Sequence, residues 1–215
     1  IIKFPDLPRV PDMLRGKIQF IVRAVYTGDA AEGAKWIQQW IDWREPMNST
    51  FKEIPYAQIG TVSNDPTDPS PTTGSNELLD ALSDDAIDVI VRYATSPESP
   101  LILNEIRHAG GAISRVARDA NAIGSRDAEF FLNMGGYTPT PEARANMQAY
   151  IQRYKAELRP HLPGSAYLNF FAGTEARNRA QDAYRPESYA RLQALKAQYD
   201  PANTFRYSYQ IVKPE

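Results

Sequence analysis

Hydrophobic residues recur with two different periods along the chain, and each period predicts a different element. Residues 17–26 (KIQFIVRAVY) are rich in β-branched and aromatic side chains, which predicts a strand, and residues 1–7 predict a shorter one. In residues 30–43 the apolar side chains instead return at helical spacing. The stripe consists of Trp36, Ile37, Trp40 and Ile41. We interpret it as the core-facing side of a helix rather than as an aromatic ligand site.

The middle of the chain contains a segment without regular periodicity. Residues 65–76 (DPTDPSPTTGSN) are a loop by composition, and we expect it to lie within one domain rather than between two. Residues 77–95 predict one or two helices, with Ser83 as an N-cap. Strands are predicted at 100–108 and 128–134, and the two can pair antiparallel.

The last third alternates helices with one short strand. A long amphipathic helix is predicted to begin at Thr140, a strand at 166–171, and two helices at 174–182 and 186–199. Several strands follow one another without an intervening helix, so strict βαβ alternation is absent. The order therefore predicts an α+β fold, with an antiparallel sheet covered by helices on one side.

Composition and charge exclude several classes of function. The sequence contains no cysteine, so disulfides and thiolate metal sites are excluded, and its two histidines lie far apart, so we expect no metal site. The formal net charge of −2 gives no support to a nucleic-acid partner, and no apolar run is long enough to suggest a membrane partner. The glycine pairs 110–111 and 135–136 are typical of turns or bulges rather than of a phosphate-binding loop. Because the sequence begins inside a strand-like segment rather than with Met, we interpret it as part of a longer protein.

Two groups of polar residues are candidates for a site. On an extended strand, Glu105 and Arg107 point to the same face, where they can form an ion pair or line a pocket for a polar substrate. Tyr167 and Asn169 likewise share a face of the short strand predicted at 166–171. A tyrosine in such a place acts as a general base if its pKa is lowered, or it is simply a buried residue with a satisfied hydroxyl.

The end of the chain carries motifs of a known family. Residues 167–170 read Tyr-Leu-Asn-Phe, and residues 196–205 read Lys-x-x-Tyr-Asp-Pro-x-Asn-x-Phe. Together they resemble the C-terminal end of the berberine bridge enzyme-like FAD-linked oxidases, which share the vanillyl-alcohol oxidase fold. Earlier segments are similar to the substrate domain of that family in the same order: 25–33, 51–59, 105–112 and 125–127.

The resemblance implies that two domains bind different molecules, one the substrate and the other the cofactor. It implies that residues 1–215 form a single substrate-binding domain and that residues 184–215 return to an FAD-binding domain that this chain lacks. FAD is then the cofactor, bound mainly by that other domain, and the partners are the domain itself and a small-molecule substrate. In this interpretation Glu105, Arg107, Arg126 and Asn169 contact the substrate, and Asn169, Asn203 and Ser208 contact the cofactor. The two arginines stabilise an oxyanion or the reduced flavin, or they only pair with acids.

Two departures from the family pattern affect these assignments. Many members have a second tyrosine, the expected base, where this chain has Phe170, which leaves Tyr167, or another residue such as Glu105, as the base. The closing segment has Ser208 and Gln210 where the family has asparagines. We therefore expect the substrate-binding part of an oxidase that passes a hydride from C–OH or C–H to flavin, with O2 as acceptor. The alternative is a non-catalytic ligand-binding or interaction domain that kept the fold.

Overall fold

The computed structural model describes residues 1–8, 10–65, 67–171, 173–207, 209 and 211. It divides into two compact units, one formed by Ile1–Phe20 with Ser70–Glu215 and the other by Ile21–Pro69. The first unit contains the sheet, and the second contains the helix with the tryptophan stripe.

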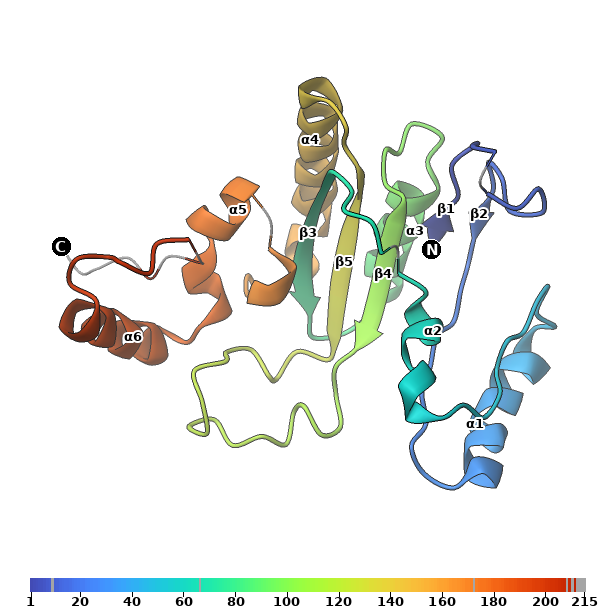
Figure 1. The fold of residues 1–215 in the computed structure, drawn as a ribbon, viewed down its shortest axis with the longest axis horizontal. Helices are drawn as coiled ribbons and strands as arrows, with labels where there is room; N and C mark the ends of the chain where they lie inside the picture. The colour runs from blue at the N-terminus through green and yellow to red at the C-terminus, as the bar shows by residue number, and fades with distance from the viewer. Residues whose placement is uncertain (9, 66, 172, 208, 210, 212–215) are drawn as a thin grey trace. The chain divides into compact units, whose positions relative to one another are not determined.

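An antiparallel sheet forms the centre of the larger unit (Figure 1). Within the described residues it has five strands in the order β2-β1-β4-β5-β3, and every pair is antiparallel. The strands are β1 (Ile2–Lys3), β2 (Ile18–Gln19), β3 (Thr72–Leu79), β4 (Leu103–His108) and β5 (Phe130–Tyr137). The predicted α+β class is confirmed, and so is the antiparallel pairing of the strands now named β4 and β5.

Two long helices cover one face of this sheet. They are α3 (Asp84–Thr95) and α4 (Pro141–Leu158), and each begins at the side chain predicted to cap it, Ser83 and Thr140. Strand residues such as Leu79, Leu132 and Met134 pack against both helices in one apolar core. The smaller unit contains α1 (Ala30–Trp43), η1 (Tyr56–Gln58) and α2 (Gly60–Ser63).

Short helical elements make up the rest of the larger unit. They are η2 (Arg159–His161), η3 (Leu168–Phe170), α5 (Gly173–Asn178), η4 (Ala180–Ala183) and α6 (Pro186–Tyr199). The short strand predicted at 166–171 is therefore wrong, because Tyr167 is extended but the chain then turns into η3. The reason is local: Phe170 and Phe171 donate their backbone N–H groups back to Tyr167 and Leu168, as in a 3₁₀ turn.

Three further predictions of local structure need correction. Residues 72–76 belong to β3 rather than to a loop, and residues 77–79 continue that strand instead of starting a helix. The predicted strands at 1–7 and 17–26 shrink to the short β1 and β2. In each case the strand state depends on a partner strand, which composition alone does not reveal.

The glycine pair 135–136 is the third correction, because it lies inside β5 rather than in a turn. A Cβ added to Gly135 would meet the Thr73 carbonyl oxygen at 2.7 Å and Gly74 Cα at 2.9 Å. Glycine here allows β5 to pair closely with β3. Gly111, in contrast, does occupy a turn, with a positive φ of 64°.

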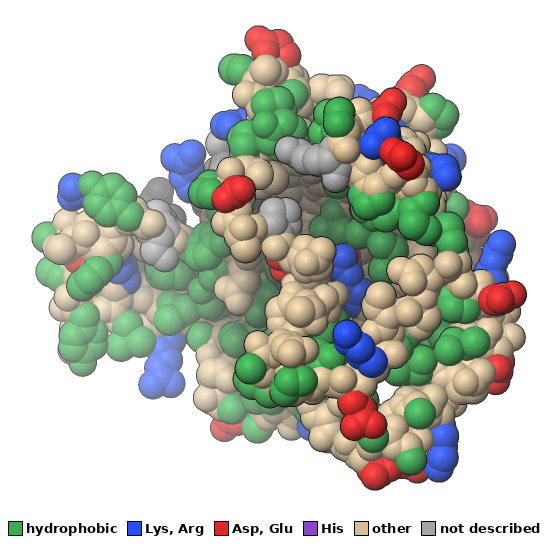
Figure 2. All heavy atoms as spheres, turned by 45° about the vertical axis from the view of Figure 1, so that its right-hand side comes forward, with side chains coloured by type: hydrophobic (Ala, Val, Ile, Leu, Met, Phe, Trp, Pro, Cys, Tyr) green, Lys and Arg blue, Asp and Glu red, His purple; other side chains and the backbone are tan. Residues whose placement is uncertain are grey.

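The tryptophan stripe is not buried as expected. Trp36 and Trp40 of α1 are 57% and 47% exposed, whereas Ile37 and Ile41 of the same stripe are half-buried, so the packing of the described residues leaves the tryptophans uncovered. Hydrophobic side chains gather in several places on the face of the molecule seen in Figure 2.

Candidate functional site

The sheet face opposite α3 and α4 carries the predicted polar residues of β4. The register pairs Glu105 with Asn133 and Arg107 with Phe131 of β5, so all four side chains share this face. Arg107 Nε donates to Glu105 Oε2 at 2.8 Å. The ion pair foreseen from the sequence is present, and since the Arg107 side chain is 51% exposed, it leaves guanidinium surface accessible.

The segment that carries Tyr167 lies against this same face. The backbone N–H of Tyr167 donates to Asn76 Oδ1 of β3 at 2.9 Å. Its ring stacks on the ring of Phe131, with centroids 5.1 Å apart and planes inclined by 7°. The chain is therefore attached to the sheet by one backbone hydrogen bond and one aromatic contact where it enters η3.

The turn of η3 brings the remaining candidates together. Asn169 Nδ2 donates to the Tyr167 hydroxyl oxygen at 2.8 Å. The Phe170 ring meets the Tyr167 ring edge-on at 5.2 Å, and the Arg107 guanidinium lies 4.8 Å from the Phe170 centroid. Tyr167 and Asn169 thus meet as predicted, although through a helical turn rather than a strand.

We call this arrangement the open-face cluster. Its members are Glu105, Arg107, Phe131, Tyr167, Asn169 and Phe170. It combines stacked and edge-on aromatic rings with a carboxylate, a guanidinium, an amide and a phenol. Among the described residues, the Tyr167 hydroxyl accepts a hydrogen bond from Asn169, and no acceptor for its own proton is found. Such a group can exchange a proton with a bound molecule.

The other predicted residues do not join the open-face cluster through any contact found. Arg126 lies in the connection between β4 and β5, where it donates to the Ile113 carbonyl oxygen and to Asn121 Oδ1. Asn203 follows α6 with a positive φ of 53°, and its buried Oδ1 has no donor within the described residues. Ser208 lies outside the described residues.

Asp200 organises the turn around Asn203. It accepts hydrogen bonds from the backbone N–H groups of Thr204 and Phe205 and forms an ion pair with Lys196. Lys196 foremost, with these backbone donors, holds the pKa of Asp200 below its ordinary value. The Lys-x-x-x-Asp spacing of the family motif therefore builds a fixed turn that presents Phe205, 77% exposed, at the surface.

A buried charge cluster attaches α5 and η4 to the helix-covered side of the sheet. Lys155 of α4 lies 2.5 Å from carboxylate oxygens of both Glu77 and Glu175, and Arg179 pairs with the same two acids. Burial alone would raise the pKa of Glu175, but Lys155, Ser75 and Arg179 together outweigh burial and lower it. Sequence reasoning missed this cluster, because its residues come from β3, α4, α5 and the residue between α5 and η4.

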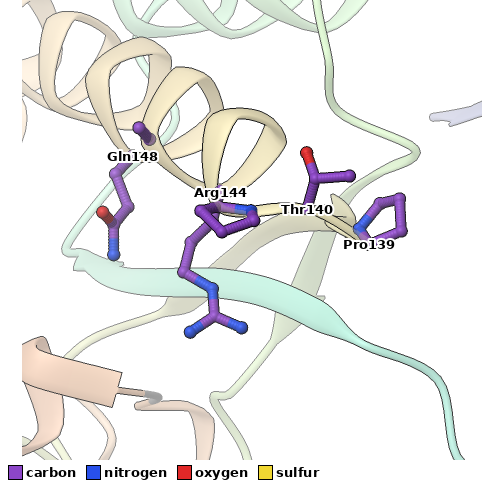
Figure 3. A pocket seen from close by; sticks show the side chains of 6 residues that line it. Pro139, Thr140, Arg144 and Gln148 are labelled. Atoms are coloured by element: carbon purple, nitrogen blue, oxygen red, sulfur yellow. The ribbon is translucent and has the colours of Figure 1, made fainter.

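One shallow hollow lies away from the open-face cluster, at the start of α4 (Figure 3). Its volume of about 230 Å³ is below the ~300 Å³ typical of ligand pockets. Arg144 and Gln148 extend from the helix beside it in the same direction. We therefore assign it no function.

Two other kinds of site are not found within the described residues. No group of acidic or histidine side chains is arranged to hold a metal, and none of the helices has the length and apolar character of a membrane span.

Comparison with known protein families gives a match for the C-terminal part of the chain. Residues 166–211 match the family model described as "Berberine and berberine like". This stretch includes Tyr167, Asn169 and the Asp200 turn. The chain is therefore related to the berberine bridge enzyme-like FAD-linked oxidases. The resemblance inferred from the motifs is confirmed.

Two curated FAD-linked oxidoreductases match most of the chain. An uncharacterized FAD-linked oxidoreductase of Bacillus subtilis (strain 168), YgaK, is 27% identical over 219 residues, which cover 95% of this chain and 47% of the relative. An FAD-linked oxidoreductase of Dictyostelium discoideum is 25% identical over 191 residues, covering 86% of this chain and 41% of the relative. The chain thus spans about half the length of the curated relatives it matches.

Solved structures share the fold of this chain. The wild-type berberine bridge enzyme-like protein 1 of Physcomitrella patens has a TM-score of 0.66 at 19% identity, covering 88% of this chain and 44% of that one. A chitooligosaccharide oxidase has a TM-score of 0.69 at 20% identity, covering 88% and 45%. At these identities the likeness concerns the fold alone.

Proposed function

We propose that this chain is the substrate-binding part of an FAD-dependent oxidoreductase. The full protein would oxidise a small organic substrate at a C–OH or C–H group, with O2 as the acceptor that reoxidises the cofactor. The relatives that match this chain are named as FAD-linked oxidoreductases, and the chain covers less than half of each. Residues 1–215 would form the substrate domain and residues 184–215 would return to an FAD-binding domain.

The observation that carries the proposal is the Tyr167 hydroxyl. It is fixed by Asn169, and its own proton has no acceptor among the described residues. FAD, when bound, supplies the acceptor for the two electrons. Tyr167 would take or hold the substrate proton, while Glu105 and Arg107 would orient polar groups of the substrate from the neighbouring strand.

The residues assigned to the cofactor are compatible with such a role. Asn203 has a buried Oδ1 without a donor in the described part of the chain, which suits an N–H or O–H donor of a bound group. Asn169 Nδ2 is engaged with Tyr167, and its Oδ1, for which no donor is found among the described residues, would be available to a substrate or to FAD. Ser208 and Arg126 keep their proposed roles, cofactor contact and substrate contact.

Substitution of Tyr167 by phenylalanine in the full-length protein tests the proposal. Tyr167→Phe keeps the ring that stacks on Phe131 and removes only the hydroxyl, so flavin reduction by substrate should slow by about tenfold or more. Stopped-flow absorbance in the flavin bands measures this rate. Tyr137→Phe, which removes an exposed hydroxyl at the end of β5, serves as the control.

The alternative function is a non-catalytic ligand-binding or interaction module. Phe170 favours it, because this residue has no proton to exchange where many oxidases of the family have a tyrosine. A full-length protein without flavin absorbance would support the module and reject the oxidase. Unchanged flavin reduction in Tyr167→Phe would reject Tyr167 as the base and leave Glu105 as the next candidate.

A further inference from the structure

Asn76 is a buried amide that no part of the proposed chemistry uses. It lies within β3 and is 0% exposed. Its Oδ1 accepts the backbone N–H of Tyr167 at 2.9 Å, while its Nδ2 is buried and has no partner among the described residues. Burying an amide is costly unless its hydrogen bonds are made, so the bond to Tyr167 is the contact that retains this side chain.

The register places Asn76 on the same face of the sheet as the open-face cluster. Asn76 pairs with Asn133 of β5, and Asn133 pairs with Glu105 of β4, so the three form a polar row across the sheet. The next row along contains Phe131, on which the Tyr167 ring stacks. Tyr167 is thus held at its backbone by one row and at its ring by the other.

Loss of the first attachment would affect more than Tyr167. The 3₁₀ turn η3 begins directly after this residue, so the position of its backbone also sets that of Asn169 and Phe170. A shift there would move the amide that donates to the Tyr167 hydroxyl.

We propose that Asn76 is a positioning residue that fixes the backbone of Tyr167 and thereby aims its hydroxyl. The attachment itself rests on the contacts above, and its consequence for turnover rests on the proposed function. Asn76 touches neither substrate nor cofactor in this proposal. It acts through Tyr167.

Two substitutions separate the hydrogen bond from the volume of the side chain. Asn76→Leu keeps a similar size and removes the acceptor. Asn76→Asp keeps an oxygen at the accepting position and replaces Nδ2, which has no partner in the described part of the chain, by the second oxygen of a carboxyl group. The matched control is Asn104→Leu, since Asn104 is also a buried asparagine of the sheet, but it faces the helices and donates to the Tyr154 hydroxyl.

The measurements are amide hydrogen exchange and flavin reduction, both on the full-length flavoprotein. Because the Tyr167 amide is protected by a single hydrogen bond, exchange in peptides spanning 166–171 should accelerate about tenfold in Asn76→Leu. Flavin reduction should slow by about tenfold, since misplacement of a reacting group is costly. Asn76→Asp should restore the protection and part of the rate, and Asn104→Leu should alter neither.

The outcomes distinguish this proposal from the proposed function. Unchanged exchange in Asn76→Leu, or the same acceleration in Asn104→Leu, would overturn the positioning role. Faster exchange with an unchanged reduction rate, in a protein where Tyr167→Phe is slow, would also overturn it. If Tyr167→Phe has no effect, the proposed base is wrong, and the exchange data alone then decide whether Asn76 holds this backbone. Should the aspartate variant fail to fold, the comparison of the two leucine variants still decides.

Discussion

At the scale of the residue, the two faces of β4 show how neighbouring side chains take on different tasks. Glu105 and Arg107 lie on the open face, where their ion pair is partly in water. Asn104 points to the other face and donates to the hydroxyl of Tyr154, a residue that is 0% exposed. Burial raises the pKa of Tyr154, so this phenol stays neutral and serves the core.

We predict that Tyr154→Phe destabilises the protein. The substitution leaves Asn104 Nδ2 buried without its acceptor, and an unsatisfied buried donor costs about 1–3 kcal/mol. Urea unfolding followed by circular dichroism measures the loss. Tyr199→Phe, which removes an exposed hydroxyl at the end of α6, is the control, and a loss as small as in that variant would contradict the prediction.

At the scale of the element, the buried charge cluster explains how the short helices after Tyr167 are held. Lys155 and Arg179 bridge Glu77 of β3 and Glu175 of α5, so α5 is tied to the sheet and to α4 at once. Removing one member of such a cluster leaves an uncompensated charge in a poorly hydrated place. The stability of this region should therefore depend on pH.

We predict that the protein loses stability in acid through Glu175. Its pKa is lower in the folded chain than in the unfolded one, so its contribution is complete above the unfolded value of about 4.3 and is lost as pH falls through the folded value. Glu175→Gln should accordingly be less stable than the parent at pH 7, and the difference should shrink as the pH falls below about 4.

Chemical denaturation at a series of pH values tests this dependence. Glu98→Gln, which neutralises an exposed acid in a turn, is the matched control and should change stability by less than about 0.5 kcal/mol. A difference between Glu175→Gln and the parent that stays constant from neutral to acidic pH would show that the cluster does not depend on this carboxylate.

At the scale of the whole molecule, the main open feature is that many large apolar side chains of the described structure remain exposed. In the smaller unit, Trp36, Trp40 and Trp43 of α1 are all about half exposed or more, and Trp40 and Trp43 meet edge-on. Large exposed apolar patches mark surfaces that pack against another protein surface.

We predict that the chain of residues 1–215, produced by itself, associates with itself as its concentration rises. Trp40→Glu should weaken the association, because it places a charge in the aromatic stripe. The control is Gln39→Glu, which adds the same charge at the neighbouring exposed position of α1. Sedimentation velocity over a range of concentrations measures the self-association. A monomer at every concentration would contradict the prediction.

The sequence by itself determined the features that depend on neighbours in the chain. Helices α3 and α4 begin at Ser83 and Thr140 as predicted, because a cap bonds to an amide only three residues away. The contacts of the motif around Asp200 are local as well, since its lysine, its carboxylate and the amides that donate to the carboxylate lie within ten residues. These local patterns also sufficed for the fold class and the family.

Only the tertiary structure decided which distant residues meet. Residues 72–76 resemble a loop in composition, and they become a strand because β5 pairs with them along their length. That pairing places Asn76 below Tyr167, a contact between residues far apart in the sequence that no periodicity encodes. The same holds for the tryptophans of α1: helical spacing establishes that they share a face, but only the packed chain determines whether that face is covered.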